Sequence, residues 1–209
     1  ERTSNKAFGI VEGLSIIGTT AETNISASPE QLKYAINELN QVLSESANDS
    51  ITFVIGENGF DLANKIHIPF PIIKVGNWIG PLLVHAANQK VKKILLFGYY
   101  GKLIKLAGGI FHTHNHLADA RIEILVYLAV KEKIPLKIIN LFMKSKTVDD
   151  AIKIVEGFNI ELAKKLISQI SNHIEIRSLE YIQKYISSEI EVGVVLFDRE
   201  RKIRSISQN

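Results

Sequence analysis

The segment from residue 93 to residue 109 is Lys93-Ile94-Leu95-Leu96-Phe97-Gly98-Tyr99-Tyr100-Gly101-Lys102-Leu103-Ile104-Lys105-Leu106-Ala107-Gly108-Gly109. Its first five residues form an apolar run of strand length, which we expect to end at Gly98. Residues 102–107 place two lysines three positions apart among apolar residues, as an amphipathic helix does. The segment therefore predicts a strand that is followed by a short helix.

Two similar units precede this segment. Residues 52–56 are prone to form a strand, with a turn expected at 56–59 and a helix at 60–66. Residues 71–75 repeat the pattern, with a turn at 76–80 and a helix at 82–89. Apolar strands alternating with helical segments favour βαβ crossovers and a parallel sheet that helices cover.

Further elements are expected on both sides of these units. They are a strand at 9–17, a helix from Ser28 to about residue 46, a helix at 117–131, helices from 136 to 187 with breaks near 146–147, 157–159 and 171–172, and a closing strand at 191–197. We therefore predict a single α/β domain over 1–209, with a mainly parallel sheet flanked by helices and a helical portion at about 117–187.

Composition excludes several classes of protein. The 209 residues include 25 Lys+Arg and 22 Asp+Glu, and a net charge of +3 is too small for a typical nucleic-acid binder. The absence of cysteine excludes disulfides, Cys-ligated zinc and a thiol nucleophile. No apolar run reaches the roughly 18 residues of a membrane span. We expect a cytoplasmic protein without nucleic-acid or membrane partners, and the initial Glu1 suggests a piece of a longer chain.

Three of the six histidines lie within five positions, at His112, His114 and His116. On an extended segment they share one face and, with Asp119, match the ligands of zinc or iron, which would indicate a hydrolase that uses a metal-bound water. Such hydrolases usually need further ligands downstream. Another interpretation is that this loop merely caps the helix expected from residue 117.

A third interpretation needs no metal. Lysines, histidines and an arginine around a glycine pair form a cationic loop suited to a substrate with several carboxylates. The residues that would bind such a substrate are Lys102, Lys105, His112, Thr113 and Arg121. His114 and Asp119 would then be available to transfer a proton or to orient the substrate.

Glycine-containing loops follow each of the three expected strands. In parallel sheets, ligands bind beyond the carboxyl ends of the strands, which makes these loops a candidate cofactor site. The candidate residues are Gly56, Asn58, Gly76, Asn77 and Gly98. None of the loops matches the dinucleotide fingerprint or the phosphate-binding loop, so ATP hydrolysis is disfavoured.

A long stretch also resembles a known family. The segment quoted above, its continuation Ile110-Phe111-His112-Thr113-His114 and the run Ala118-Asp119-Ala120-Arg121-Ile122-Glu123-Ile124-Leu125 closely resemble the signature of the CbiD family. The flanking pieces that fit are Ile17-Gly18-Thr19-Thr20, Gly56-Glu57-Asn58-Gly59, Gly76-Asn77-Trp78-Ile79-Gly80 and Val194-Val195-Leu196-Phe197-Asp198. The resemblance covers most of 9–198 and is strongest over 76–125.

CbiD proteins are cobalt-precorrin-5B C1-methyltransferases of anaerobic cobalamin (vitamin B12) biosynthesis. The resemblance implies methyl transfer from S-adenosylmethionine to C1 of this cobalt-containing tetrapyrrole, which gives cobalt-precorrin-6A. It implies no protein-bound metal, because the cobalt belongs to the substrate. Other enzymes of the pathway or a second copy of the chain are the further partners expected.

Two departures from the family pattern leave alternatives open. Residues 21–25 differ from the family's usual continuation after Thr20, and family members carry an additional N-terminal region of a hundred or more residues. The resemblance is thus to the C-terminal part of the enzyme. The metal-dependent hydrolase and a non-catalytic corrinoid-binding module remain the alternatives.

Overall fold

The computed structural model describes residues 29–45 and 49–207. In chain order the elements are α1 (Pro29–Glu45), β1 (Ser50–Val54), α2 (Glu57–Lys65), β2 (Ile72–Lys74), α3 (Ile79–Asn88), β3 (Lys93–Tyr99), α4 (Tyr100–Ala107), α5 (Arg121–Lys131), α6 (Leu136–Phe142), α7 (Val148–Phe158), α8 (Ile160–Gln183), β4 (Glu191–Phe197) and β5 (Ile203–Ile206). The strand expected at 9–17 and the helix start at Ser28 lie outside the described residues.

The five strands form one mixed sheet in the order β2-β1-β3-β4-β5. The first four are parallel, and β5 pairs with β4 in the antiparallel direction. The predicted α/β class with a mainly parallel sheet is therefore confirmed. β4 is not the closing strand, however. The turn before β5 uses Arg201 at a φ of 62°, and β5 has only four residues, too few for a clear alternating pattern.

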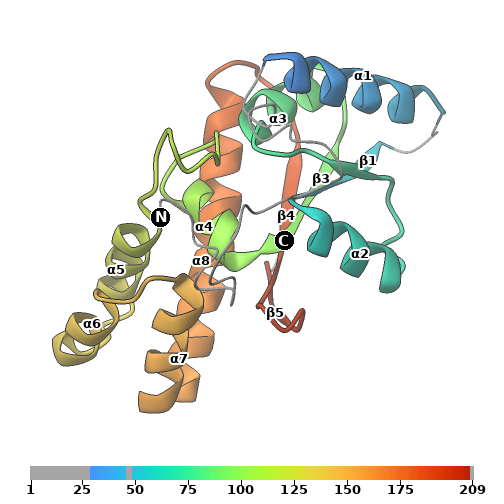
Figure 1. Cartoon of the computed structure of the whole chain (residues 1–209). Coiled ribbons are helices and arrows are strands. Elements are labelled where there is room, and N and C mark those ends of the chain that lie inside the picture. Colours follow the sequence, from blue (N-terminus) through green and yellow to red (C-terminus); the bar gives the residue numbers. More distant parts are fainter. Residues whose placement is uncertain (1–28, 46–48, 208–209) are drawn as a thin grey trace.

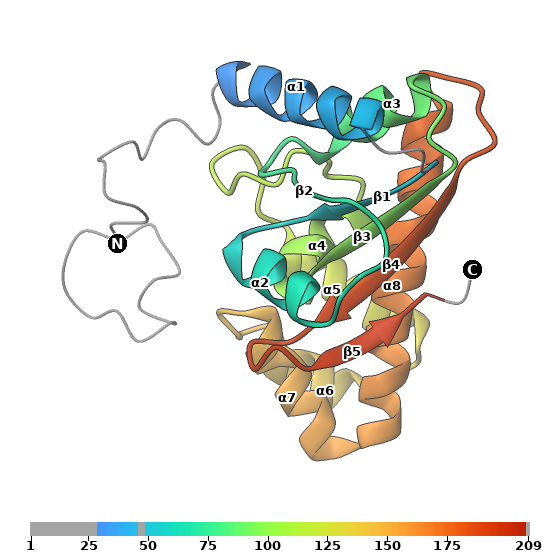
Figure 2. The same cartoon turned by 90° about the vertical axis from the view of Figure 1, so that its right-hand side faces the viewer.

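Helices cover both faces of the sheet unequally. Figures 1 and 2 show α2 on one face, with α4 and the long α8 on the opposite face. α3 packs against both α1 and α8, α5 and α7 pack against α8, and α6 packs against α5 and α7. Among the helices of the described ranges, none is long and apolar enough to cross a membrane.

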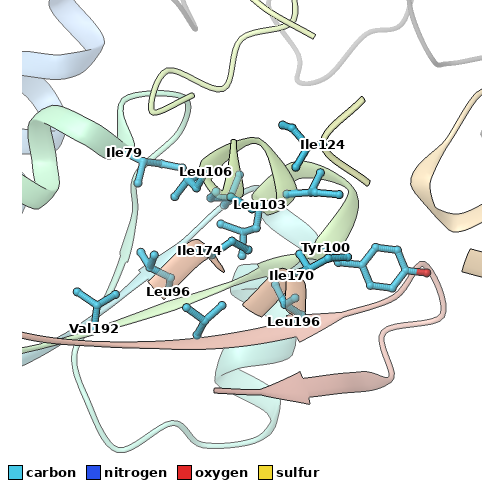
Figure 3. Close-up of a cluster of buried hydrophobic side chains, with 14 of the residues drawn as sticks. Ile79, Leu96, Tyr100, Leu103, Leu106, Ile124, Ile170, Ile174, Val192 and Leu196 are labelled. Carbon is cyan, nitrogen blue, oxygen red and sulfur yellow. The ribbon is translucent and has the colours of Figure 1, made fainter. Parts of the chain in front are cut away.

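α4 lies at the centre of the larger hydrophobic core. It follows β3 without an intervening loop and packs between the sheet and α8. Figure 3 shows Leu103 and Leu106 of α4 among side chains of β3, β4 and α8. Gly98 lies within β3 rather than after it. A Cβ at this position would be 2.8 Å from Leu103 Cδ1, so only glycine leaves room for the Leu103 side chain. Close packing, not a turn, explains this glycine.

The predicted turns at 57–59 and at 79–80 are wrong, because both segments are helical. α2 already begins at Glu57 and α3 at Ile79. A Cβ on Gly59 would be 2.8 Å from Val54 Cγ1, and a Cβ on Gly80 would be 2.8 Å from Phe111 Cβ. These glycines lie where a helix approaches its neighbour closely, and such a position also favours glycine.

Two expected boundaries in the helical portion are also wrong. α5 begins at Arg121 rather than at Leu117, because the carbonyl of Ala118 accepts a hydrogen bond from Lys105 instead of starting a helix. α8 continues through the break expected at 171–172. The Ser171 hydroxyl is hydrogen-bonded to the Ser168 carbonyl and to Ser205, so it is satisfied inside the helix.

The central position of α4 predicts a large stability difference between two leucines. Leu103→Ala removes a side chain that is 0% exposed and should lower the free energy of unfolding by about 2–5 kcal/mol. Leu136→Ala, at a position that is 69% exposed, should cost less than about 0.5 kcal/mol. Urea unfolding of the two variants measures the difference, and equal losses would contradict the packing described.

Candidate functional site

A buried lysine lies beneath the loop that joins α4 to α5. The Lys105 side chain is 0% exposed, and burial lowers its pKa. Its ammonium donates hydrogen bonds to the Thr113 carbonyl at 3.0 Å, to Asn115 Oδ1 at 2.7 Å and to the Ala118 carbonyl at 2.8 Å. All three ammonium hydrogens are thus directed at the loop. The sequence pattern predicts that Lys105 and residues of this loop both bind the substrate.

The same loop is attached to the segment that follows β2. Thr113 donates its backbone N–H to the Asn77 carbonyl at 3.1 Å and its hydroxyl to Asn77 Oδ1 at 3.0 Å. The Gly80 N–H donates to the Phe111 carbonyl at 3.0 Å. The loop therefore lies at the edge of the sheet where the parallel strands have their carboxyl ends, as ligand sites of α/β sheets do.

Two of the clustered histidines accept hydrogen bonds from the loop backbone. The His114 N–H lies 3.4 Å from His112 Nδ1, and the His116 N–H lies 3.3 Å from His114 Nδ1. Burial lowers the pKa of His112 and of His114, and the neighbouring histidine and Lys105 lower each of them further. Both imidazoles are therefore neutral and accept protons only below the ordinary histidine range.

The structure gives the metal-site interpretation no support. Within the described ranges, no group of three or more His, Cys, Asp or Glu side chains is arranged to hold a metal ion. The capping interpretation of this loop is wrong, because α5 starts at Arg121 and residues 115–117 form a turn instead.

A bidentate ion pair closes the far end of the loop. Arg121 Nε and Nη2 donate to the two carboxylate oxygens of Asp119 at 2.6 and 2.7 Å. The hydrogen bond from Arg121 holds the pKa of Asp119 below its usual range. Lys102, on the first turn of α4, is an exposed residue that makes no hydrogen bond or ion pair to any described residue, although partial burial of its side chain and the nearby Arg121 lower its pKa. An uncompensated cation thus lies near this pair.

A cavity of about 280 Å³ lies beside that ion pair. Its walls come from the end of the loop, the start of α5 and the segment between α6 and α7. The lining residues are Asp119, Arg121, Ile122, Glu123, Met143, Lys146 and Val148. The cavity brings a second lysine, Lys146, to the site, which sequence reasoning missed because it lies 25 positions after Arg121.

The residues predicted for cofactor binding divide into two groups. Gly56 and Gly76 follow β1 and β2 at φ values of 78° and 57°, and a Cβ on either would meet no atom within 4 Å. Their backbone is therefore open to a ligand. Asn77 holds Thr113, and Asn58 accepts a hydrogen bond from Arg201. Gly98 lies inside β3 and does not join the open loops.

A second cavity, of about 310 Å³, opens at the ends of β3 and β4. Its lining residues are Tyr100, Asp149, Lys153, Glu156, Asp198, Arg199, Glu200, Lys202 and Arg204. The Tyr100 hydroxyl donates to the buried Asp149 at 2.6 Å, and Arg204 pairs with Asp198 and Glu156. Burial and this hydrogen bond raise the pKa of Tyr100. No local pattern in the sequence indicates this network, because its members come from three distant segments.

These features define an α/β protein with a histidine-rich loop at the carboxyl edge of its sheet, beside the lysines of α4. The comparison with protein families is consistent with that description. Residues 112–208 match the family model "CbiD, C-terminal domain". The resemblance to the CbiD family is thereby confirmed, and the chain carries the C-terminal domain of that family.

The most similar relatives compared all bear one name, cobalt-precorrin-5B C(1)-methyltransferase. The protein from Prochlorococcus marinus subsp. pastoris is 63% identical over the whole chain, and the one from strain MIT 9515 is 58% identical. The protein from strain MIT 9303 is 46% identical over 97% of the chain. The chain spans 56%, 56% and 53% of the length of these relatives. No solved structure matches it.

The attachment of the loop predicts opposite effects of two Thr→Val substitutions. Thr113→Val removes the hydroxyl bound to Asn77 and should lower the free energy of unfolding by about 1 kcal/mol. The Thr52 hydroxyl is buried and has no hydrogen-bond partner among the described residues, so Thr52→Val should be neutral or stabilising. Chemical denaturation of both variants tests this, and a loss confined to Thr52→Val would refute it.

The lowered pKa values of His112 and His114 predict the pH dependence of stability. The unfolded chain protonates these histidines near their ordinary pKa of about 6.5, whereas the folded protein protonates them only at lower pH. Folding stability should therefore fall as the pH decreases from about 7.5 to 5.5. Imidazole titration by NMR, with His114→Gln for assignment, checks the cause. Titration at or above the ordinary value would contradict it.

Proposed function

We propose that the protein of which this chain forms part or all transfers a methyl group from S-adenosylmethionine to C1 of cobalt-precorrin-5B, giving cobalt-precorrin-6A in anaerobic cobalamin biosynthesis. The observation that carries this proposal is the 63% identity, over all 209 residues, to a relative named for that reaction. The chain is thus proposed to belong to a methyltransferase whose substrate is a cobalt-precorrin.

The charge of the loop supports a tetrapyrrole with many carboxylates as the substrate. Lys102 is exposed and unpaired among the described residues, which leaves its ammonium available to an acetate or propionate group. Arg121 and Lys146 line the adjacent cavity and offer two further cations. Thr113 is buried and bound to Asn77, so its proposed contribution to substrate binding is the position of the loop.

The pKa values suggest different roles for the two proposed catalytic residues. When bound, S-adenosylmethionine would supply the methyl group to C1 of the substrate and leave as S-adenosylhomocysteine. Nδ1 of the neutral His114 accepts the His116 N–H, so its proton lies on Nε2 and His114 is suited to orient the substrate by donating a hydrogen bond. Asp119 is held ionised by Arg121, so it is suited to orient Arg121 and the substrate.

The donor is proposed to bind at the open loops after β1 and β2. Gly56 and Gly76 present backbone with free space around it, and Asn58 and Asn77 belong to the same loops. Gly98 would contribute only through the close packing of β3 against α4. We also propose that the chain forms a single domain over 1–209 and binds no metal of its own. The protein is further proposed to act in the cytoplasm with partners from the same pathway.

Two calorimetric titrations test the proposed function. S-adenosylhomocysteine should bind close to one to one, and adenosine more weakly. If the chain does not bind it, the titration is repeated on a chain that carries the further length present in the relatives. Absence of binding in both forms would refute the methyltransferase assignment.

The second titration uses cobyrinic acid, a stable cobalt corrinoid whose acetate and propionate groups are free carboxylates. Lys102→Met should weaken its binding about tenfold, because a hydrogen bond to a charged group contributes about 1.5–3 kcal/mol. Lys65→Met replaces an exposed lysine on α2 and should leave the affinity unchanged. Equal affinities of both variants and the unmodified chain would remove Lys102 from the site.

A further inference from the structure

We propose that Lys105 is a positioning residue, which fixes the shape of the loop from residue 112 to residue 118 and does not itself bind substrate carboxylates. The inference rests on the function proposed for that loop. It changes the role that the sequence suggests for Lys105, from a direct ligand of the substrate to an internal support beneath the residues that contact it.

Burial makes the three loop oxygens necessary. An ammonium group removed from water costs several kcal/mol unless its hydrogens find partners. The Lys105 side chain is fully buried, and its three hydrogen bonds, all at 3.0 Å or less, match its three N–H donors. No donor remains for a substrate, and a loop that moved away would leave a buried charge unsatisfied.

The three acceptors are spread along the loop and therefore determine its course. They are the carbonyls of Thr113 and Ala118, near its two ends, and the side chain of Asn115 in the middle. With both ends and the middle drawn toward Lys105, the alternating residues His112, His114 and His116 lie next to one another. Their successive ring centroids are 6.4 and 4.8 Å apart.

The charge of Lys105 also acts on the loop from below. All three of its acceptors are neutral oxygens, of two backbone carbonyls and one amide side chain. The carboxylate of Asp119 is engaged by Arg121 and does not pair with Lys105. The charged or titratable groups around His112 and His114 are Lys102 and Lys105 from α4, His116, Asp119, Arg121, and Arg177 and Tyr181 of α8, which contact Gly109 and Phe111. Burial is the main reason that the pKa values of these imidazoles are low, and the predominance of positive groups adds to it and favours an anionic ligand.

Variants at both ends of one hydrogen bond test the proposal. Lys105→Met keeps the side-chain length but removes the charge and all three donors. Asn115→Leu removes one acceptor at an exposed position, where the fold should tolerate the change, and Asn115→Asp restores an acceptor of the same shape. Lys65→Met serves as a distant control on α2.

The readout is amide hydrogen exchange together with NMR titration of the imidazoles. In Asn115→Leu, and in Lys105→Met if it folds, the amides of Thr113, His114 and His116 should exchange at least tenfold faster, while those of β3 and α8 should not change. The pKa of His112 and of His114 should rise in Lys105→Met but not in Asn115→Leu, which changes no charge. Asn115→Asp should restore slow exchange.

Unchanged amide exchange of the loop in a folded Asn115→Leu variant would overturn the proposal. Faster amide exchange throughout β3 and α8 would also overturn it, because it would indicate a purely structural role. These measurements need no substrate. Failure to bind cobyrinic acid, both by the unmodified chain and by a chain with the further length present in the relatives, would therefore refute the proposed function and leave the role of Lys105 to be decided by exchange.

Discussion

The burial of α4 between the sheet and α8 is the constraint on which the rest of the structure depends. β3 leads directly into α4, and glycines allow the close approach: a Cβ on Gly108 would be 2.4 Å from Ile124 Cδ1. An eight-residue helix enclosed in this way buries most of its surface, Lys105 included. A charge forced into the core then requires oxygen partners, and the neighbouring loop supplies them.

Hydrophobic packing and the proposed binding chemistry are thus linked through one side chain. The fixed loop brings the neutral histidines and the Asp119–Arg121 pair to one edge of the sheet, close to Lys102 of α4. Each of these groups would be far weaker as a binding element on a free loop, because ordering the loop would then oppose binding. A preformed surface of this kind would suit the carboxylate-bearing substrate that we propose from the names of the relatives.

The sequence predicted what depends on local pattern and missed what depends on tertiary contact. The strands at 50–54, 72–74, 93–99 and 191–197 were recognisable because buried parallel strands are continuous apolar runs. Glycines were interpreted as turns, although Gly59 and Gly98 serve close packing. Lys105 has the spacing of an exposed helix position, and nothing in the neighbouring sequence shows that the loop after α4 covers it. The Tyr100–Asp149 network joins residues 49 positions apart and has no local signal.

We propose that the loop between α4 and α5 forms the surface that binds a carboxylate-bearing corrinoid. The most direct test of this proposal is backbone NMR of the isotope-labelled chain during titration with cobyrinic acid. The account predicts that the largest shift changes fall on Lys102, on residues 112–116 and on Arg121, and that they diminish with rising salt. Changes centred instead on Arg199 and Arg204, at the other cavity, would contradict it.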